Sequence, residues 1–261
     1  MSAAIKPKGP RLASPESSSS QWAESYLGST VGSKILVAIT GLLLVGFVVF
    51  HMIGNLKLLY GRSSINEYAH FLKHGLGPLL WIARGGLLAI FIGHIALALK
   101  LKARTASARP VPYLNQRSTQ ATLQSRTMLT SGLVVGAFIL FHLAHFTFGW
   151  THDADLGNGM RANYLELTDP AGHADVYSMM IAGFSTPWIA VIYVVAQLVL
   201  FAHLSHGIQS TIQTIGLKGT RFAGLWTSLG YAVAGTVLLG NLLIVGAVWS
   251  GWLAPVYPMA K

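Results

Sequence analysis

Long runs of apolar residues dominate the pattern of hydrophobic and polar positions along the chain. Each run is close to the roughly 20 residues that an α-helix needs to cross a hydrocarbon core about 30 Å thick. The apolar character is continuous and lacks the alternation of barrel strands, and a backbone in lipid must satisfy its hydrogen bonds internally, so the runs predict helices. The predicted spans cover residues 35–56, 79–99, 128–148, 187–206 and 222–253.

The composition agrees with a membrane protein. Hydrophobic residues make up 52% of the chain and charged residues 10%, with a mean hydropathy of +0.54. A soluble domain carries about a quarter of its residues charged, so a soluble fold, a disordered chain and a coiled coil are excluded. The chain has no cysteine, which excludes disulfides, thiolate metal ligands and an iron–sulfur cluster of its own. The expected fold class is an all-α, polytopic five-helix bundle.

The positions of the basic residues predict the topology. Residues 1–26 are rich in serine and proline, lack an apolar core and predict a disordered tail, which leaves 27–261 as the membrane domain. The tail, the segment up to residue 34, and the loops at 100–126 and 218–221 contain twelve lysines and arginines, whereas the opposite face contains five. Cytoplasmic loops carry the excess of these residues, so the N-terminus is predicted to be cytoplasmic. The net charge of +10 is therefore a topology signal and not a nucleic-acid signal.

Histidines within the spans carry the remaining chemistry. The chain has no P-loop, no dinucleotide fingerprint, no HExxH and no nucleophile elbow. An ionisable group inside a membrane span is costly to leave unpaired, and four of the five spans contain histidine. No internal repeat is evident beyond a loose alternation in where these histidines fall. The histidines are His51, His94, His142, His145, His203 and His206.

Depth sorts four of these histidines into two pairs. His51 and His142 lie 17 and 16 residues after the last basic residue before their outward-running spans, close to the outer face. His94 and His203 each lie 16 residues after a proline at the outer end of an inward-running span, nearer the cytoplasm. Two facing pairs at two levels are what two stacked bis-imidazole centres require, and haem b is the apolar, planar centre that suits a bilayer. The sequence therefore predicts two haems, with the outer pair His51/His142 and the inner pair His94/His203.

Three further side chains are candidates for supporting roles. His145 and His206 lie one turn from His142 and His203, and are expected to bond a haem propionate or solvent. Arg84, the only charge within a span, is expected either to pair with a propionate or to extend towards the outer interface. For any single histidine, a hydrogen bond between helices is the alternative to metal ligation.

The segment between the first two spans is expected to be an exposed loop. Its polar side chains are also candidate proton acceptors beside a quinone near the outer haem. They are Glu67, His70 and His74.

Several strings resemble the single-chain dihaem cytochrome b of succinate:quinone oxidoreductases. The segment from His203 to Gly207 is similar to the family's His-x-x-x-Gly pattern, in which the first histidine is the ligand. Some members have a glutamate two residues before that ligand, where this chain has Phe201, so a transmembrane proton path by that route is not expected. The other matching strings are residues 33–56, 65–72, 81–84 and 108–113.

The resemblance implies a membrane anchor subunit of succinate dehydrogenase (complex II) or fumarate reductase in the bacterial cytoplasmic membrane. It implies two b haems, ligated by His94 and His203 near the cytoplasm and by His51 and His142 near the outer face. An iron–sulfur subunit and a flavoprotein subunit would dock on the basic cytoplasmic face, which membrane lipid also attracts, and electrons would pass between their clusters and a quinone. The chain itself has no soluble domain for a dicarboxylate site. Alternatives are a cytochrome b subunit of a hydrogenase or formate dehydrogenase, and a transporter without haem that uses its histidines as proton relays.

Overall fold

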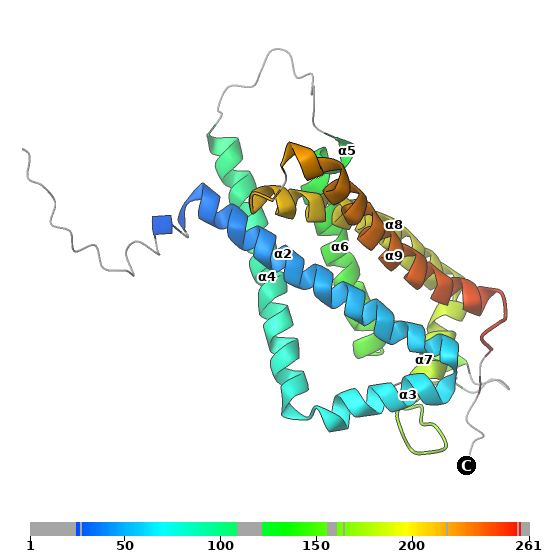
Figure 1. Cartoon of the computed structure of the whole chain (residues 1–261). Coiled ribbons are helices and arrows are strands. Elements are labelled where there is room, and N and C mark those ends of the chain that lie inside the picture. Colours follow the sequence, from blue (N-terminus) through cyan, green and yellow to red (C-terminus); the bar gives the residue numbers. More distant parts are fainter. Residues whose placement is uncertain are drawn as a thin grey trace, which may run out of the picture.

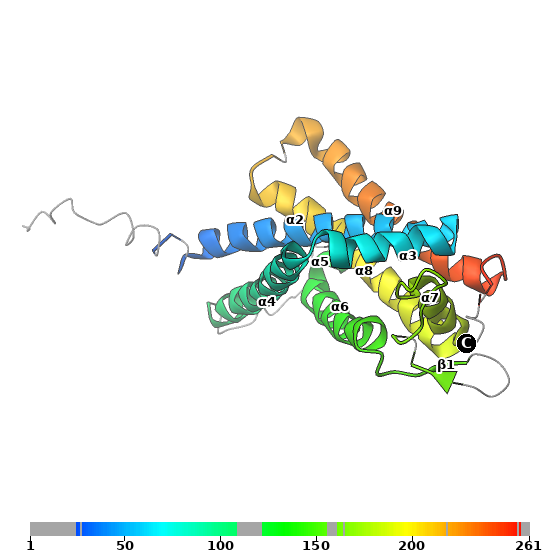
Figure 2. The same cartoon turned by 90° about the horizontal axis from the view of Figure 1, so that it is seen from below.

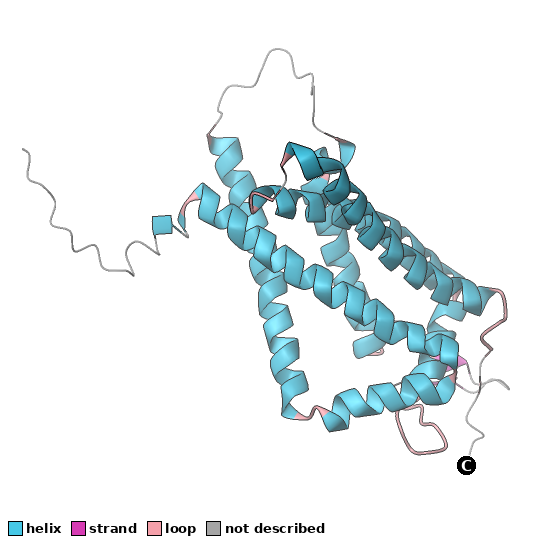
Figure 3. Cartoon of the chain, viewed as in Figure 1, coloured by secondary structure: helices cyan, strands magenta, loops and turns pink. Residues whose placement is uncertain are grey.

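The computed structural model describes residues 25–26, 28–108, 122–155, 161–163, 165–217, 219–254 and 256, and it is helical apart from one short hairpin (Figures 1 and 3). Five of its helices are long and apolar enough to cross a membrane, which confirms the predicted all-α fold class with five spanning helices. Most of the predicted N-terminal tail lies outside the described residues. The five helices are α2 (Thr30–Asn55), α4 (Pro78–Ser107), α6 (Met128–His142), α8 (Pro187–Thr214) and α9 (Ala223–Trp249).

Several helices extend beyond their predicted apolar limits. α2 begins at Thr30 because the Ser29 hydroxyl caps it, accepting a hydrogen bond from the Gly32 amide at 3.0 Å. α4 continues to Ser107, so its last two turns carry lysines and arginines beyond the apolar run. Arg104 in this extension donates a hydrogen bond to the Gly28 carbonyl at 2.7 Å, which joins the end of α4 to the segment before α2.

Four of the spanning helices form a ring. α2 packs against α4 and α8, α6 packs against α8, and α6 meets α4 in a smaller contact (Figures 1 and 2). In this ring, α2 lies diagonally opposite α6, and α4 lies diagonally opposite α8. α9 lies outside the ring against α8 and α2.

Contacts with α9 fix which face of α2 is turned outward from the ring. Met52 is 3% exposed, and a Cβ built at Gly240 of α9 would lie 2.5 Å from its sulfur, so the two helices approach closely there. Asn241 of α9 donates a hydrogen bond to Gln197 of α8 at 3.1 Å. With Met52 turned towards α9, the adjacent His51 is directed to another face of α2.

Short elements connect the spanning helices, and most of them lie at the end of the bundle where α2 and α6 end (Figure 2). The α2 helix passes through a 3₁₀ turn, η1 (Leu56–Tyr60), into α3 (Arg62–His70) and a π-helical turn, η2 (Phe71–Gly75). α6 ends in a second π-helical turn, η3 (Leu143–Thr147), and η4 (Thr220–Phe222) leads into α9. The remaining elements are α5 (Leu123–Arg126), β1 (Ala154–Asp155), β2 (Arg161–Ala162) and α7 (Val176–Ser185).

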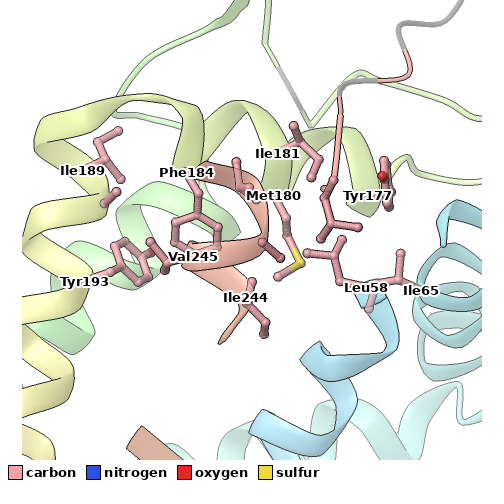
Figure 4. Packing of buried hydrophobic residues seen from close by; sticks show 14 residues of the cluster. Leu58, Ile65, Tyr177, Met180, Ile181, Phe184, Ile189, Tyr193, Ile244 and Val245 are labelled. Carbon is pink, nitrogen blue, oxygen red and sulfur yellow. The ribbon is translucent and has the colours of Figure 1, made fainter. Parts of the chain in front are cut away.

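α3 and α7 pack together with the nearby ends of the spanning helices around a shared apolar core, and we call this assembly the cap. In Figure 4 the side chains of α7 point towards those of η1, α8 and α9. The largest fully buried members are Leu58, Ile181 and Ile189. The sequence did not predict the cap, because the segment that contains α3 was expected to be an exposed loop and no helix was predicted for the segment that forms α7.

A buried polar cluster joins α3 to the start of α7. The Arg62 guanidinium donates to the Asp175 carboxylate at 2.6 Å, and Asn66 donates to the same carboxylate at 3.0 Å. Asp175 also caps α7 by accepting from the Ser178 amide at 3.2 Å. Burial opposes ionisation of Asp175, but the hydrogen bonds from Arg62, Ser178 and Asn66 outweigh it and hold the pKa of this carboxyl below its ordinary value.

Candidate functional site

The ring of helices brings together both predicted histidine pairs. The rings of His51 and His142 lie with their centroids 5.7 Å apart and nearly perpendicular, at 88°. His94 and His203 are close enough to interact electrostatically. Because α2 lies opposite α6 and α4 lies opposite α8, each pair spans a diagonal of the ring.

The inner histidine on α4 is held by a hydroxyl on α2. Thr40 Oγ1 lies 3.0 Å from His94 Nδ1. The same hydroxyl lies 2.7 Å from the Leu36 carbonyl oxygen and 3.1 Å from the Val37 carbonyl oxygen, so its single hydrogen is committed to the backbone of its own helix. A Cβ built at Gly41 would lie 3.1 Å from His94 Cε1, so the ring approaches the α2 backbone where no side chain intervenes.

The inner histidine on α8 is held in the same way by α6. Ser131 Oγ lies 3.1 Å from His203 Nδ1 and donates to the Met128 carbonyl at 3.0 Å. A Cβ built at Gly132 would lie 3.1 Å from His203 Cε1. A hydroxyl followed by a glycine therefore contacts each inner imidazole.

These hydrogen bonds leave the other ring nitrogen available as a ligand. Where each hydroxyl donates to its own backbone, it offers an oxygen lone pair to the imidazole, and this arrangement favours the tautomer in which Nδ1 is the donor. A neutral imidazole with its proton on Nδ1 carries the lone pair on Nε2, which is the atom that binds a metal. Both His94 and His203 are thus oriented for ligation through Nε2.

A tyrosine supports the outer pair from one side. Tyr193 of α8 places its hydroxyl 3.1 Å from His142 Nδ1 and 2.9 Å from His145 Nδ1. The His51 ring stacks on Phe47 with centroids 5.3 Å apart. The two outer histidines therefore differ in their surroundings, whereas the surroundings of the two inner histidines match.

His145 is fully buried, which contradicts the expectation that it could bond solvent. Its exposed fraction is 0%, and its ring packs against Phe146 with centroids 3.9 Å apart. A Cβ at Gly183 of α7 would lie 2.9 Å from its Cε1, so α7 closes over the ring. The prediction placed this histidine one turn nearer the surface, because no helix was predicted for the segment that forms α7.

α4 lies beside both histidine pairs and packs against α2 and, in a smaller contact, against α6. None of its side chains is buried. A Cβ added at Gly85, Gly86 or Gly93 would meet no atom within 4 Å, so these faces of the helix are turned away from the other described helices.

The donor set fits a haem better than a bare metal ion. Among the described residues, no group of three or more histidine or acidic side chains could hold a metal ion. A pair of imidazoles is the axial set of a b-type haem, whose porphyrin supplies the other ligands. His51 and His142, whose ring centroids lie 5.7 Å apart, would hold one such group, and His94 and His203 would hold the other.

Arg84 does not find an acidic partner within the described part of the chain. Its guanidinium lies over the Trp81 ring, 5.0 Å from the centroid, on the same helix. Both side chains are exposed. The predicted pairing of Arg84 with a haem propionate therefore stays a prediction.

The residues expected in the loop between the first two spans lie in helical turns. Glu67 and His70 belong to α3, and His74 belongs to η2. The His70 ring stacks on His74 at 4.4 Å and lies 4.0 Å from His173, centroid to centroid. Desolvation, followed by repulsion from His173 and His74, lowers the pKa of His70. The expectation of a loop was wrong.

Thr40, Ser131 and Tyr193 were not predicted as site residues, although the sequence carries a signal for the first two. Residues 40–51 read TGLLLVGFVVFH and residues 131–142 read SGLVVGAFILFH, with a hydroxyl, a glycine and a histidine at matching positions. The histidines on α4 and α8 likewise follow their helix-initial prolines by the same 16 residues. The loose alternation of the histidines therefore extends to hydroxyl, glycine and proline positions, which repeat between the helix pairs α2–α4 and α6–α8.

The comparisons with known proteins identify no relative. No family model, no curated protein and no solved structure matches the chain.

Proposed function

We propose that this protein is a dihaem cytochrome b that anchors a succinate dehydrogenase or fumarate reductase in the membrane and passes electrons between an iron–sulfur subunit and a quinone. The single observation that carries the haem assignment is the pairing of four intramembrane histidines across the diagonals of one helix ring. The assignment to this class of enzyme rests on the sequence resemblance of the strings around His51, His94 and His203.

The distance between the two levels suits an electron relay across the membrane. Thr40 marks the inner level on α2 and His51 the outer, eleven residues apart. At 1.5 Å per residue this separation is about 16 Å along the helix. Two b haems would supply one-electron transfer at these two depths.

Specific residues would hold each haem. His94 and His203 would ligate the inner one through Nε2, with Thr40 and Ser131 behind them. His51 and His142 would ligate the outer one, and Tyr193 would orient His142. Arg84 would neutralise a propionate.

A pyridine haemochrome assay on the purified protein tests the haem assignment. We expect two b haems per polypeptide, and one haem each for His142→Ala and His203→Ala. The matched controls His145→Ala and His206→Ala remove an imidazole one turn away and should retain both. Zero haem in the wild type would favour the transporter alternative, and loss of haem from the control variants would reverse the choice of ligands.

The proposed partners approach from the end of the bundle that carries the α4 extension. Basic side chains gather there, including Lys100, Lys102 and Arg104, whereas Arg109, Arg117 and Lys218 lie outside the described residues. Under the positive-inside rule this end is cytoplasmic. A photo-crosslinker at residue 104 should capture an iron–sulfur protein in native membranes, whereas one at residue 155 or 166 should not. Capture of the iron–sulfur protein from residues 155 or 166 alone would show that the topology is the reverse of the one predicted.

A cytochrome b of a hydrogenase or formate dehydrogenase would give the same haem count. Co-purification distinguishes these enzymes. If the chain belongs to a succinate:quinone oxidoreductase, the complex purified with it should reduce a quinone analogue when succinate is supplied. Hydrogen- or formate-dependent reduction in its place would overturn the enzyme class and leave the haem assignment intact.

A further inference from the structure

We propose that Thr40 and Ser131 are positioning residues, each of which fixes the orientation and the tautomer of the inner histidine on the neighbouring helix. This inference rests on the proposed haem function. It deepens that function by assigning control of the inner haem to two hydroxyls that are not ligands.

Both hydroxyls are oriented by their own helices, independently of the imidazole. Each belongs to a helix and donates to a carbonyl one turn earlier, so its rotamer is set by its own backbone. The lone pair then faces Nδ1 at 3.0 Å in one case and 3.1 Å in the other. This geometry favours the Nδ1–H tautomer of both rings in the same way.

The adjacent glycines make the contact between hydroxyl and imidazole possible. A Cβ at Gly41 or Gly132 would approach within 3.1 Å of the Cε1 atom of the facing ring. Contacts this short force the neighbour to shift by a few tenths of an ångström. The hydroxyl therefore holds the imidazole ring at Nδ1, and the absence of a side chain at the glycine lets the ring lie against the helix backbone.

The arrangement of a hydroxyl and a glycine facing an inner histidine occurs twice, on α2 and on α6. The hydroxyl–glycine pair stands eleven residues before the outer ligand in both α2 and α6, and it contacts the inner ligand of the following spanning helix in both cases. Serine and threonine side chains commonly donate a hydrogen bond to a carbonyl of their own helix, and that bond by itself would have only a structural role. The contact with an imidazole on a neighbouring helix is what takes these two residues beyond that structural role.

The consequence concerns ligand strength. A hydrogen bond accepted from the far nitrogen of a ligating imidazole increases the basicity of the ligating nitrogen, and loss of such partners typically costs about 10- to 100-fold in affinity. A more basic ligand favours the ferric state. Removing either hydroxyl should therefore weaken retention of the inner haem and raise its midpoint potential.

The experiment compares Thr40→Val, Ser131→Ala and the conservative variant Thr40→Ser in the full complex. Potentiometric titration and low-temperature electron paramagnetic resonance report on each haem separately. We expect an upward shift of one midpoint, altered g-values for that haem alone, about 10-fold weaker haem retention, and recovery of all three in Thr40→Ser.

Thr227→Val is the matched control. Thr227 lies in α9 and donates to the Ala223 carbonyl at 2.9 Å, and within the described part of the chain its hydroxyl makes no hydrogen bond to a histidine. Its replacement should leave both haems unchanged. If both test variants also leave the haems unchanged in a wild type that holds two, the positioning role is refuted and the haem function stands. If the wild type holds no haem, the proposed function fails, and this inference fails with it.

Discussion

Replacing Arg62 by methionine tests whether the polar cluster between α3 and α7 holds the cap in place. The change keeps an apolar stem of similar length but leaves the Asp175 carboxylate, whose side chain has an exposed fraction of 0%, without its cation. Removing one partner of a buried ion pair costs about 3–5 kcal/mol. Asn66 and the Ser178 amide still donate to the carboxylate, and the Arg62 side chain is 16% exposed, so we expect a loss near the lower end, about 3 kcal/mol.

Hydrogen–deuterium exchange of α7 measures this loss as local opening of the cap. The amides of Tyr177 and Ser178 donate to Asn66 and Asp175, so they exchange when the cluster separates. A loss of about 3 kcal/mol corresponds to about 100-fold faster exchange. Lys73→Met is the control, because Lys73 is exposed and makes no ion pair with a described residue. Exchange in Arg62→Met within about two-fold of the wild type would refute the reasoning.

Three further predictions follow from the same contacts. Gly41→Val should displace the ring of the inner histidine and lower inner-haem occupancy, whereas Gly235→Val, with no atom within 4 Å of the added Cβ, should not; spectra of both variants decide this. Tyr193→Phe removes the hydroxyl behind His142 and should shift the midpoint potential of the outer haem alone, measured by redox titration. Because the folded-state pKa of Asp175 lies below its unfolded value near 3.9, its stabilisation of the cap is complete above that value and is lost as the pH falls through the folded pKa; cap opening that speeds up only as the pH rises would contradict this.

The spans and the histidine pairs could be predicted because both depend on local quantities. A continuous apolar run of about 20 residues has few outcomes other than a spanning helix. The fixed rise of a helix converts residue counts into depth, so equal counts before His94 and His203 place them at one level. The structure brings both predicted pairs together.

The cap could not be predicted because its stability comes from distant segments. α3 is a polar nine-residue helix, too short to be stable alone, and Asn66 on it bonds a carboxylate 109 positions later in the chain. The burial of His145 follows from the same element, since α7 packs over it through Gly183. Thr40 and Ser131 were missed for another reason, because a hydroxyl inside a spanning helix ordinarily bonds its own backbone, and only the facing helix reveals its second contact.

The repeat of helix pairs also explains why the two ends of the site differ. Arg84 in α4 occupies the position that Tyr193 occupies in α8, six residues after the helix-initial proline and ten before the histidine. The tyrosine hydroxyl can accept a hydrogen bond from the Nδ1–H group of His142, whereas a guanidinium only donates and cannot do so for His51. At the inner level, by contrast, threonine and serine are chemically equivalent. Under the proposed function, the inner haem would have two ligands with matching hydrogen-bond partners. The outer haem would have one ligand, His142, with a hydrogen-bond partner, and the positive charge of Arg84 at a similar depth. This asymmetry would give the two haems different midpoint potentials.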